Sequence, residues 1–362
     1  MPPSPNEPLR LSAADLYAPA VEEYLDVQAM MSRPMPEVEP QLWIVRVLYS
    51  SYFYLSMAGG LGALVAWMIL EPFFVDNDAQ AGGPEKFQWV NFLLFPTVAG
   101  SIGMFLGAAE GIICRNPTRS LLCASVGLGI GFLGGLLALI AASILFAISV
   151  GLSLAASRRE VQPGEMPNGL GFLVLMMGRA TAWSVASIPA GIGQGIALRE
   201  MKVVVNGLLG GVLGGLLGGM LFDPISVVFA SPDGEAWISR GVGLTIIGLF
   251  VGLFVGIVEQ WTKSAWLLMK AGPLAGKQFV VFRNPTVLGS SPKADIYLFK
   301  DEAIEPRHAL IHDRGGRFEI EDMDSADGTY VNGIPVRRQI LHPGDQIVLG
   351  KTVLVFALKE NQ

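Results

Sequence analysis

A long uncharged stretch in the middle of the chain constrains the fold more than any other feature. From Leu121 to Ser157 the sequence has no charged residue for 37 positions, a length of about 55 Å as α-helix. About 20 mostly apolar residues are enough to cross the hydrocarbon core of a bilayer. The stretch is too long for one crossing and too short for two, so we expect its outer end to project or to bend. Such a segment indicates a chain that spends much of its length in lipid.

The composition of the whole chain excludes several other classes of protein. Of the 362 residues, 51% are hydrophobic and only 15% are charged, whereas about 25% are charged in soluble proteins. The net charge of −6 argues against nucleic acid as the main partner. Two cysteines in or beside apolar runs and three histidines near the C-terminal end offer no disulfide scaffold and no metal centre. We therefore expect neither a metal site nor a cofactor.

Apolar runs of crossing length predict an α-helical polytopic membrane bundle over residues 43–262. The six expected crossings are residues 46–70, 90–112, 121–145, 179–198, 203–222 and 240–261. A Pro-rich acidic tail, residues 1–42, precedes them and contains a capping-box pattern that begins at Ser12. The pattern predicts a short helix, and two roles stay open for it: packing on the rest of the protein, or docking a partner.

The distribution of lysine and arginine predicts the orientation of these crossings. Six basic residues lie on one face of the membrane: Arg115, Arg119, Arg199, Lys202, Lys263 and Lys270. The N-terminal segment adds three more to this face, against four on the opposite face. Because short cytoplasmic loops carry the excess of positive charge, both termini are predicted to be cytoplasmic, in a multi-pass protein of the cytoplasmic (inner) membrane. No usable glycosylation sequon is present, and a bacterial source is expected.

An internal repeat is the clearest feature of the predicted membrane domain. Residues 107–135 align with residues 191–219 at a constant offset of 84. A weaker third half-copy follows 61 residues later, in which Arg240, Gly252, Gly256 and Lys263 match Arg179, Gly191, Gly195 and Lys202. Each full copy is a hairpin of two crossings, and the sixth crossing takes the place of the fourth.

Glycines at four-residue spacing predict how the crossings pack. Seven of them form the candidate packing faces of a glycine zipper: Gly127, Gly131, Gly135, Gly207, Gly211, Gly215 and Gly219. A second register, Gly210, Gly214 and Gly218, runs along the fifth crossing. Small residues let membrane helices approach closely and gain dispersion contacts. The pattern favours tight packing, with homo-oligomer formation left open; a conduction pathway is the alternative.

Few charged residues fall inside the crossings. Glu110 and Gln194 are equivalent in the repeat and lie about one turn from the cytoplasmic interface, so we expect them to reach the interface or, for Glu110, to pair with Arg115. Arg179 and Arg240 lie at the outer ends of their crossings and receive the same interpretation.

Residues 264–362 have a different pattern, in which apolar and polar residues alternate within short runs. Runs of four to seven residues are separated by Gly, Asp, Asn and Pro, and the pairs Asn332-Gly333 and Gly315-Gly316 are typical of hairpin turns. About ten strands in this length predict an all-β sandwich.

Four motifs in this region resemble the forkhead-associated (FHA) family. They are Val287–Ser290, Arg307–Ala309, Ser325–Gly333 and Leu341–Asp345. The resemblance implies a cytoplasmic, non-catalytic β-sandwich whose loops bind phosphothreonine peptides. The framework residues of the family signature are present here as Gly289, His308 and Gly328.

The positions that read the ligand in this family are substituted. Where the resemblance implies a phosphate-binding Arg, a phosphate-binding Ser and a peptide-binding Asn, this chain has Ser290, Glu305 and Asp327. Phosphothreonine carries about −1.5 to −2 charge at pH 7, so two carboxylates near the same loops oppose it. Three cations are close in sequence and are candidates to replace the missing Arg: Lys293, Lys300 and Arg307.

These observations predict a membrane-embedded scaffold or adaptor and no enzyme, because no nucleophile–base or zinc spacing is present. Its expected partners are the lipid bilayer and a cytoplasmic protein or peptide, phosphorylated or not. Two alternatives stay open: a channel or transporter regulated by the FHA-like domain, and a phosphothreonine-dependent signalling receptor coupled to a Ser/Thr kinase.

Overall fold

The computed structural model describes residues 42–74, 89–157, 166–229 and 236–359. The predicted helix near Ser12 lies outside these residues. The chain divides into two compact units. The first described here is helical and is built from Gln41–Trp266 together with Gly276–Arg283; the other, from Leu267–Ala275 and Asn284–Leu358, is made of strands.

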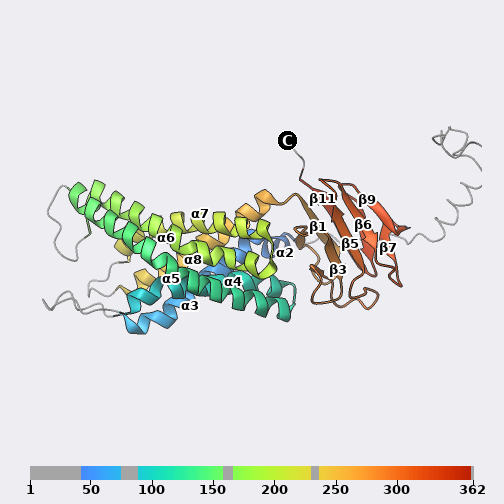
Figure 1. Ribbon diagram of the computed structural model, residues 1–362, viewed down its shortest axis with the longest axis horizontal. Helices are drawn as coiled ribbons and strands as arrows, with labels where there is room; N and C mark the ends of the chain where they lie inside the picture. The colour runs from blue at the N-terminus through green and yellow to red at the C-terminus, as the bar shows by residue number, and fades with distance from the viewer. Residues whose placement is uncertain (1–41, 75–88, 158–165, 230–235, 360–362) are drawn as a thin grey trace, which may run out of the picture. The chain divides into compact units, whose positions relative to one another are not determined.

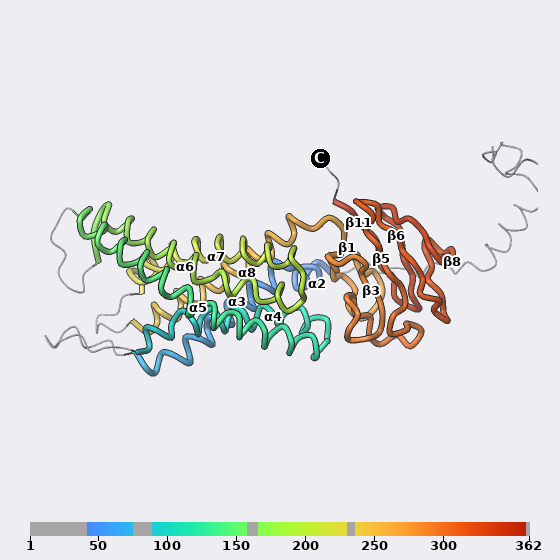
Figure 2. The backbone as a smooth tube through the Cα atoms, viewed as in Figure 1, coloured from blue at the N-terminus to red at the C-terminus, as the bar shows by residue number. Residues whose placement is uncertain are grey.

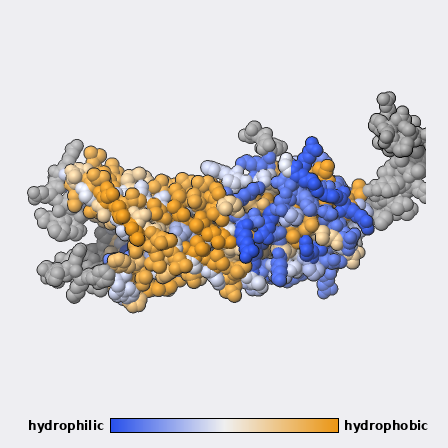
Figure 3. All heavy atoms as spheres, in the orientation of Figure 1, coloured by the Kyte–Doolittle hydropathy of each residue, from blue (hydrophilic) through white to orange (hydrophobic). Residues whose placement is uncertain are grey.

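Six long helices form the helical unit, as predicted (Figure 1). With two short elements, the order is α2 (Trp43–Leu48), α3 (Ser51–Leu70), the 3-10 helix η2 (Glu71–Phe73), α4 (Val90–Ile113), α5 (Pro117–Ala156), α6 (Leu170–Leu198), α7 (Met201–Val228) and α8 (Trp237–Thr262). All six long helices have the length and the apolar composition needed to cross a membrane. Apolar residues cover most of the visible face of this unit (Figure 3).

Two helices, α5 and α6, extend furthest beyond the predicted crossings. α5 is one continuous helix of 40 residues, so the uncharged stretch continues past residue 145 without a break. α6 begins at Leu170 instead of residue 179. The two extensions pack on each other, as the trace in Figure 2 shows, and Ser153 Oγ donates a hydrogen bond of 2.6 Å to the Gly171 carbonyl. Each extension supplies the neighbour that the other needs, which no single segment of the sequence reveals.

The structure places the seven zipper glycines on two buried helix faces. Those of α5 meet the backbone of α4, and those of α7 meet the backbone of α6. A Cβ added to Gly211 would come within 2.8 Å of the Ser187 carbonyl oxygen. The matching contact, 84 residues earlier, is between Gly127 and Gly103. The two hairpins of the repeat therefore pack through equivalent atoms.

The second glycine register of α7 contacts a different helix. Gly210, Gly214 and Gly218 lie against Val255, Val251 and Ile247 of α8. Four-residue spacing keeps each register on one face of α7. α7 thus uses one row of glycines for each of its two neighbours.

The structure also supplies the missing half of the third repeat. Gly252 of α8 meets the backbone of Leu55, and a Cβ on Gly59 would meet the backbone of Gly248, both on the α3–α8 interface. The same two contacts occur between α6 and α7, as Gly191 with Gly207 and as Ser187 with Gly211. Each α8 residue lies 61 positions after its α6 equivalent, and each α3 residue lies 152 positions before its α7 equivalent. The third repeat unit is therefore the pair of α8 and α3, the last and the first long helices. Helices α3 to α8 form a closed ring, in which each helix packs on the next and α8 packs on α3.

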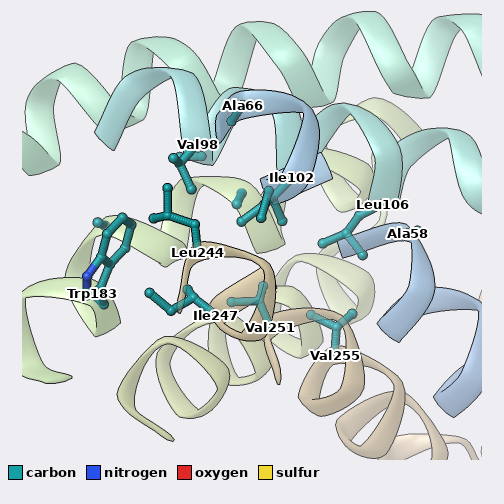
Figure 4. Close-up of a cluster of buried hydrophobic side chains, with 14 of the residues drawn as sticks. Ala58, Ala66, Val98, Ile102, Leu106, Trp183, Leu244, Ile247, Val251 and Val255 are labelled. Atoms are coloured by element: carbon teal, nitrogen blue, oxygen red, sulfur yellow. The ribbon is translucent and has the colours of Figure 1, made fainter. Parts of the chain in front are cut away.

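The ring encloses a core contributed mainly by α3, α4, α6 and α8 (Figure 4). Its buried side chains include Ala58, Ala66, Val98, Ile102, Leu106, Trp183, Leu244, Ile247, Val251 and Val255. Larger side chains from one helix thus lie opposite small residues of another, which is how close packing is reached.

Glu110 contacts two polar side chains of neighbouring helices. Its carboxylate pairs with Arg119 at 3.4 Å and lies 3.5 Å from the Gln194 amide nitrogen. Arg115 adopts a left-handed backbone conformation at the end of the helical hairpin turn, with φ of 50°, as does its repeat equivalent Arg199 with φ of 56°. The turn therefore presents Arg119, in the first turn of α5, to Glu110.

Residues 265–358 form a sandwich of two sheets, as predicted. Its strands are β1 (Ala265–Ala271), β2 (Gln278–Val280), β3 (Thr286–Gly289), β4 (Ile296–Tyr297), β5 (Ala309–Asp313), β6 (Phe318–Asp322), β7 (Thr329–Val331), β8 (Ile334–Val336), β9 (Arg338–Leu341), β10 (Gln346–Leu349) and β11 (Thr352–Leu358). The sheet orders are β2-β1-β11-β10-β7-β8 and β4-β3-β5-β6-β9. Asn332 and Gly333, with φ of 53° and 83°, form the tight turn between β7 and β8.

Candidate ligand-binding loops of the β-sandwich

Three loops of the sandwich meet around the end of β3. The amide of Ser290 donates to the Glu305 carbonyl at 2.9 Å, which joins the loop after β3 to the segment before β5. A side chain on Gly289 would collide with the Pro306 backbone. Glycine is required here because the two backbones approach closely.

His308 is completely buried, and its side chain connects two of these loops. Its Nδ1 accepts a hydrogen bond of 3.2 Å from the Glu305 amide, so the ring proton lies on Nε2. Nε2 lies 3.2 Å from the Gly328 carbonyl and 3.1 Å from Ser325 Oγ. With φ of +74°, Gly328 has a backbone conformation that favours glycine. The imidazole thereby fixes the loop before β5 against the loop before β7.

A partly buried carboxylate completes the polar network around His308. Asp322 Oδ1 accepts hydrogen bonds from Ser325 Oγ at 2.7 Å and from Thr329 Oγ1 at 2.6 Å. Its other oxygen accepts the Ser325 amide at 3.0 Å. Sequence reasoning did not single out Asp322, because its role depends on the pairing of β6 with the loop before β7.

Glu305 bridges two of these loops through its side chain. Its Oε1 accepts a hydrogen bond of 3.0 Å from the Ala326 amide. The carboxylate is partly buried, whereas Ala326 is exposed. A backbone N–H at the surface of the loop cluster is therefore already bound to an anionic group of the protein itself.

The remaining substituted positions and the nearby cations lie at the surface of the cluster. Ser290 and Asp327 are partly buried. The three candidate cations, Lys293, Lys300 and Arg307, are exposed. The structure thus brings the framework residues together in a hydrogen-bonded core and leaves the basic side chains outside it.

Comparison with known proteins identifies this unit. The family model described as FHA domain matches residues 286–350. These residues are an FHA domain. An oxoglutarate dehydrogenase inhibitor of Corynebacterium efficiens is 43% identical over 93 residues, which are 26% of this chain and 65% of that protein. The glycogen accumulation regulator GarA of Mycolicibacterium smegmatis is 42% identical over 105 residues, 29% of this chain and 66% of that protein.

These two relatives match only part of this chain. This chain spans 65% and 66% of the length of these two relatives. Among solved structures, the FhaA FHA domain in complex with the intracellular domain of a second protein is 28% identical, with a TM-score of 0.24, and covers 26% of this chain and 99% of that one. The resemblance that the motifs predicted is confirmed, and with it a protein-recognition module at the C-terminal end.

Proposed function

We propose that this protein is a membrane-embedded, non-enzymatic scaffold that presents its FHA domain to the cytoplasm, where the domain recognises a protein or peptide without requiring phosphothreonine. The apolar composition of the six long helices supports the membrane part of the proposal. The contacts of Glu305 support the mode of recognition.

The hydrogen bond between Glu305 and Ala326 is the observation that carries the proposal. A phosphate needs donors and cations, and its binding strengthens when both are free to face it. Here the Glu305 carboxylate takes the Ala326 amide and leaves its own negative charge in the loop cluster. Like charges about 4 Å apart repel by about 1 kcal/mol in bulk water and by about 4 kcal/mol at an effective dielectric of 20.

Ser290 and Asp327 act in the same direction. The short hydroxyl of Ser290 cannot make the bidentate contact of a guanidinium with phosphate. Asp327 adds a second carboxylate next to Gly328. The cluster is therefore suited to a neutral or basic partner more than to a phosphorylated one.

A titration of the full chain in detergent tests this reading. We expect phosphothreonine peptides to bind with a Kd no better than about 1 mM, or about −4 kcal/mol. The combined change Ser290→Arg, Glu305→Ser and Asp327→Asn should raise the affinity by about tenfold or more, because it adds one guanidinium and removes two carboxylates. Glu302→Ser is the matched control, since Glu302 is an exposed carboxylate on the same loop.

Capture of partners provides the positive test. The immobilised full chain should retain the same proteins from a lysate before and after phosphatase treatment. Micromolar binding of a phosphothreonine peptide by the unmodified chain, or loss of all captured proteins after phosphatase treatment, would instead establish phosphorylation-dependent signalling.

A further inference from the structure

A cavity inside the helical unit lies apart from the FHA domain. Its volume is about 260 Å³, and residues of α4, α5, α6, α7 and α8 line it. Two arginines, Arg179 of α6 and Arg240 of α8, contribute to its wall together with aromatic and aliphatic side chains. Charged groups inside a predicted membrane bundle are costly and are functional candidates by default.

Each arginine is held by a carboxylate of a neighbouring helix. Arg179 Nε lies 2.8 Å from Asp223 Oδ1, and the Asp223 side chain is completely buried. Arg240 makes a two-point contact with Glu71. That both arginines reach the membrane interface stays a prediction; the structure adds that each one is paired with a carboxylate, as desolvation favours.

The two ion pairs occupy equivalent positions in the threefold repeat. Arg240 follows Arg179 by 61 residues, as Gly252 follows Gly191. Asp223 follows Glu71 by 152 residues, the offset that relates α7 to α3. The repeat thus places the same ion pair twice around one cavity.

The remaining repeat unit, α4 with α5, carries apolar residues at both positions. The residue 84 positions before Arg179 is Phe95, and the residue 84 positions before Asp223 is Leu139. Both line the same cavity, and the Phe95 ring packs edge-on against Trp183 at 4.8 Å. Two sectors of the cavity therefore offer guanidinium groups, and the third offers an apolar wall.

The carboxylate partners do not line the cavity. Among the described residues that form its wall, none is acidic, while Asn91 and Ser143 add neutral polar groups. Guanidinium groups match the geometry of carboxylate and phosphate oxygens. The charges of the two ion pairs sum to zero, so a singly charged anion leaves one uncompensated charge and a doubly charged anion leaves two.

We propose that this cavity binds a monocarboxylate with a short apolar body, its carboxylate held by Arg179 and Arg240 and its body packed on Phe95 and Leu139. A small volume with an apolar wall and a few convergent polar groups is typical of small-molecule sites. The carboxylate can come from the aqueous phase, as in a small aromatic acid, or from the membrane, as in a fatty acid.

Binding of tritiated phenylacetate to the full chain in phosphatidylcholine nanodiscs tests the proposal. We expect saturable binding that unlabelled phenylacetate displaces and that the neutral analogue phenylacetamide does not. Phenyl phosphate should compete more weakly, because it carries a second charge. Absence of saturable binding, equal competition by phenylacetamide, or tighter binding of phenyl phosphate would overturn the assignment.

Two variants locate the site without leaving an unpaired charge buried in the bundle. Leu139→Trp fills the cavity and keeps both ion pairs, and Leu137→Trp on the same helix, where the side chain is 77% exposed, is its control. Arg179→Gln combined with Asp223→Asn removes one pair and leaves no unpaired ion. We expect binding to weaken by about tenfold or more in Leu139→Trp, because the indole occupies the cavity, and in the double variant, because one guanidinium is lost.

Leu137→Trp should bind as the unmodified chain does. Unchanged binding in Leu139→Trp would place the ligand elsewhere and reject the proposal. Competition by octanoate distinguishes the source of the ligand: displacement at lower free concentration than phenylacetate assigns a membrane fatty acid, and the reverse assigns an aqueous acid.

Discussion

His308 of the FHA domain has a purely internal set of partners. Both ring nitrogens lie within hydrogen-bond distance of groups in neighbouring loops, and no part of the side chain is exposed. Removing it would leave the Glu305 amide and the Gly328 carbonyl without these partners. An unsatisfied buried polar group costs about 1–3 kcal/mol, so the residue acts on ligand recognition through the order of the loops.

We expect His308→Ala to destabilise the FHA domain by about 2–4 kcal/mol, because the Glu305 amide and the Gly328 carbonyl both lose a hydrogen-bond partner. Hydrogen–deuterium exchange of the full chain should show faster exchange in β5 and in the loop of residues 323–328. His342→Ala is the control, because the His342 side chain is 76% exposed. Equal exchange in the two variants would show that the loops are held by other contacts.

At the scale of the helices, the two glycine registers of α7 explain why one element tolerates so many glycines. In water each glycine would cost about 1 kcal/mol relative to alanine. Here one row meets α6 and the other meets α8, so both rows gain close backbone contacts. α5 differs, since its glycines at 127, 131 and 135 meet α4 while Gly129 has open space around it.

Replacing Gly211 or Gly215 with Leu should lower the thermal stability of the detergent-solubilised chain. An added Cβ would already meet the α6 backbone within 2.8 Å at Gly211 and 2.5 Å at Gly215. Overpacking costs about 1–3 kcal/mol in general, and rigid backbone neighbours place these sites at the upper end. Gly129→Leu, the matched control, should not lower the melting temperature, and a similar loss there would mean that the close backbone contacts do not decide the effect.

At the scale of the whole molecule, the ring of six helices has both of its chain ends on the same side. α3 begins and α8 ends at their shared interface, where Gly256 meets Ser51. An even number of crossings places the start of the first helix and the end of the last helix on the same face of the membrane. From the excess of Lys and Arg in the short turns we propose that this face is cytoplasmic.

Labelling of intact cells with an impermeant maleimide tests the orientation. In a chain with both cysteines replaced by alanine, a cysteine at position 314 of the FHA domain should stay unlabelled until the cells are opened. A cysteine introduced between positions 75 and 85 should react from outside. The reverse pattern would invert the topology and remove the FHA domain from the cytoplasm.

Local patterns in the sequence were sufficient to predict much of this protein. The long apolar runs predicted six helices, because the length and composition of a membrane crossing are properties of a single segment. The Asn332-Gly333 turn and the FHA motifs predicted the sandwich for the same reason. The sequence also related two hairpins of the repeat and half of a third.

The tertiary structure alone decided which segments complete one another. α3 carries too few matching residues to be aligned with α5 and α7, yet it packs on α8 through the same backbone contacts. Only the closed ring brings Arg179, Arg240, Phe95 and Leu139 to one cavity, and only the meeting of two loops shows that Glu305 binds the Ala326 amide. These are contacts between residues far apart in the sequence, and their energies depend on distances that no local pattern encodes.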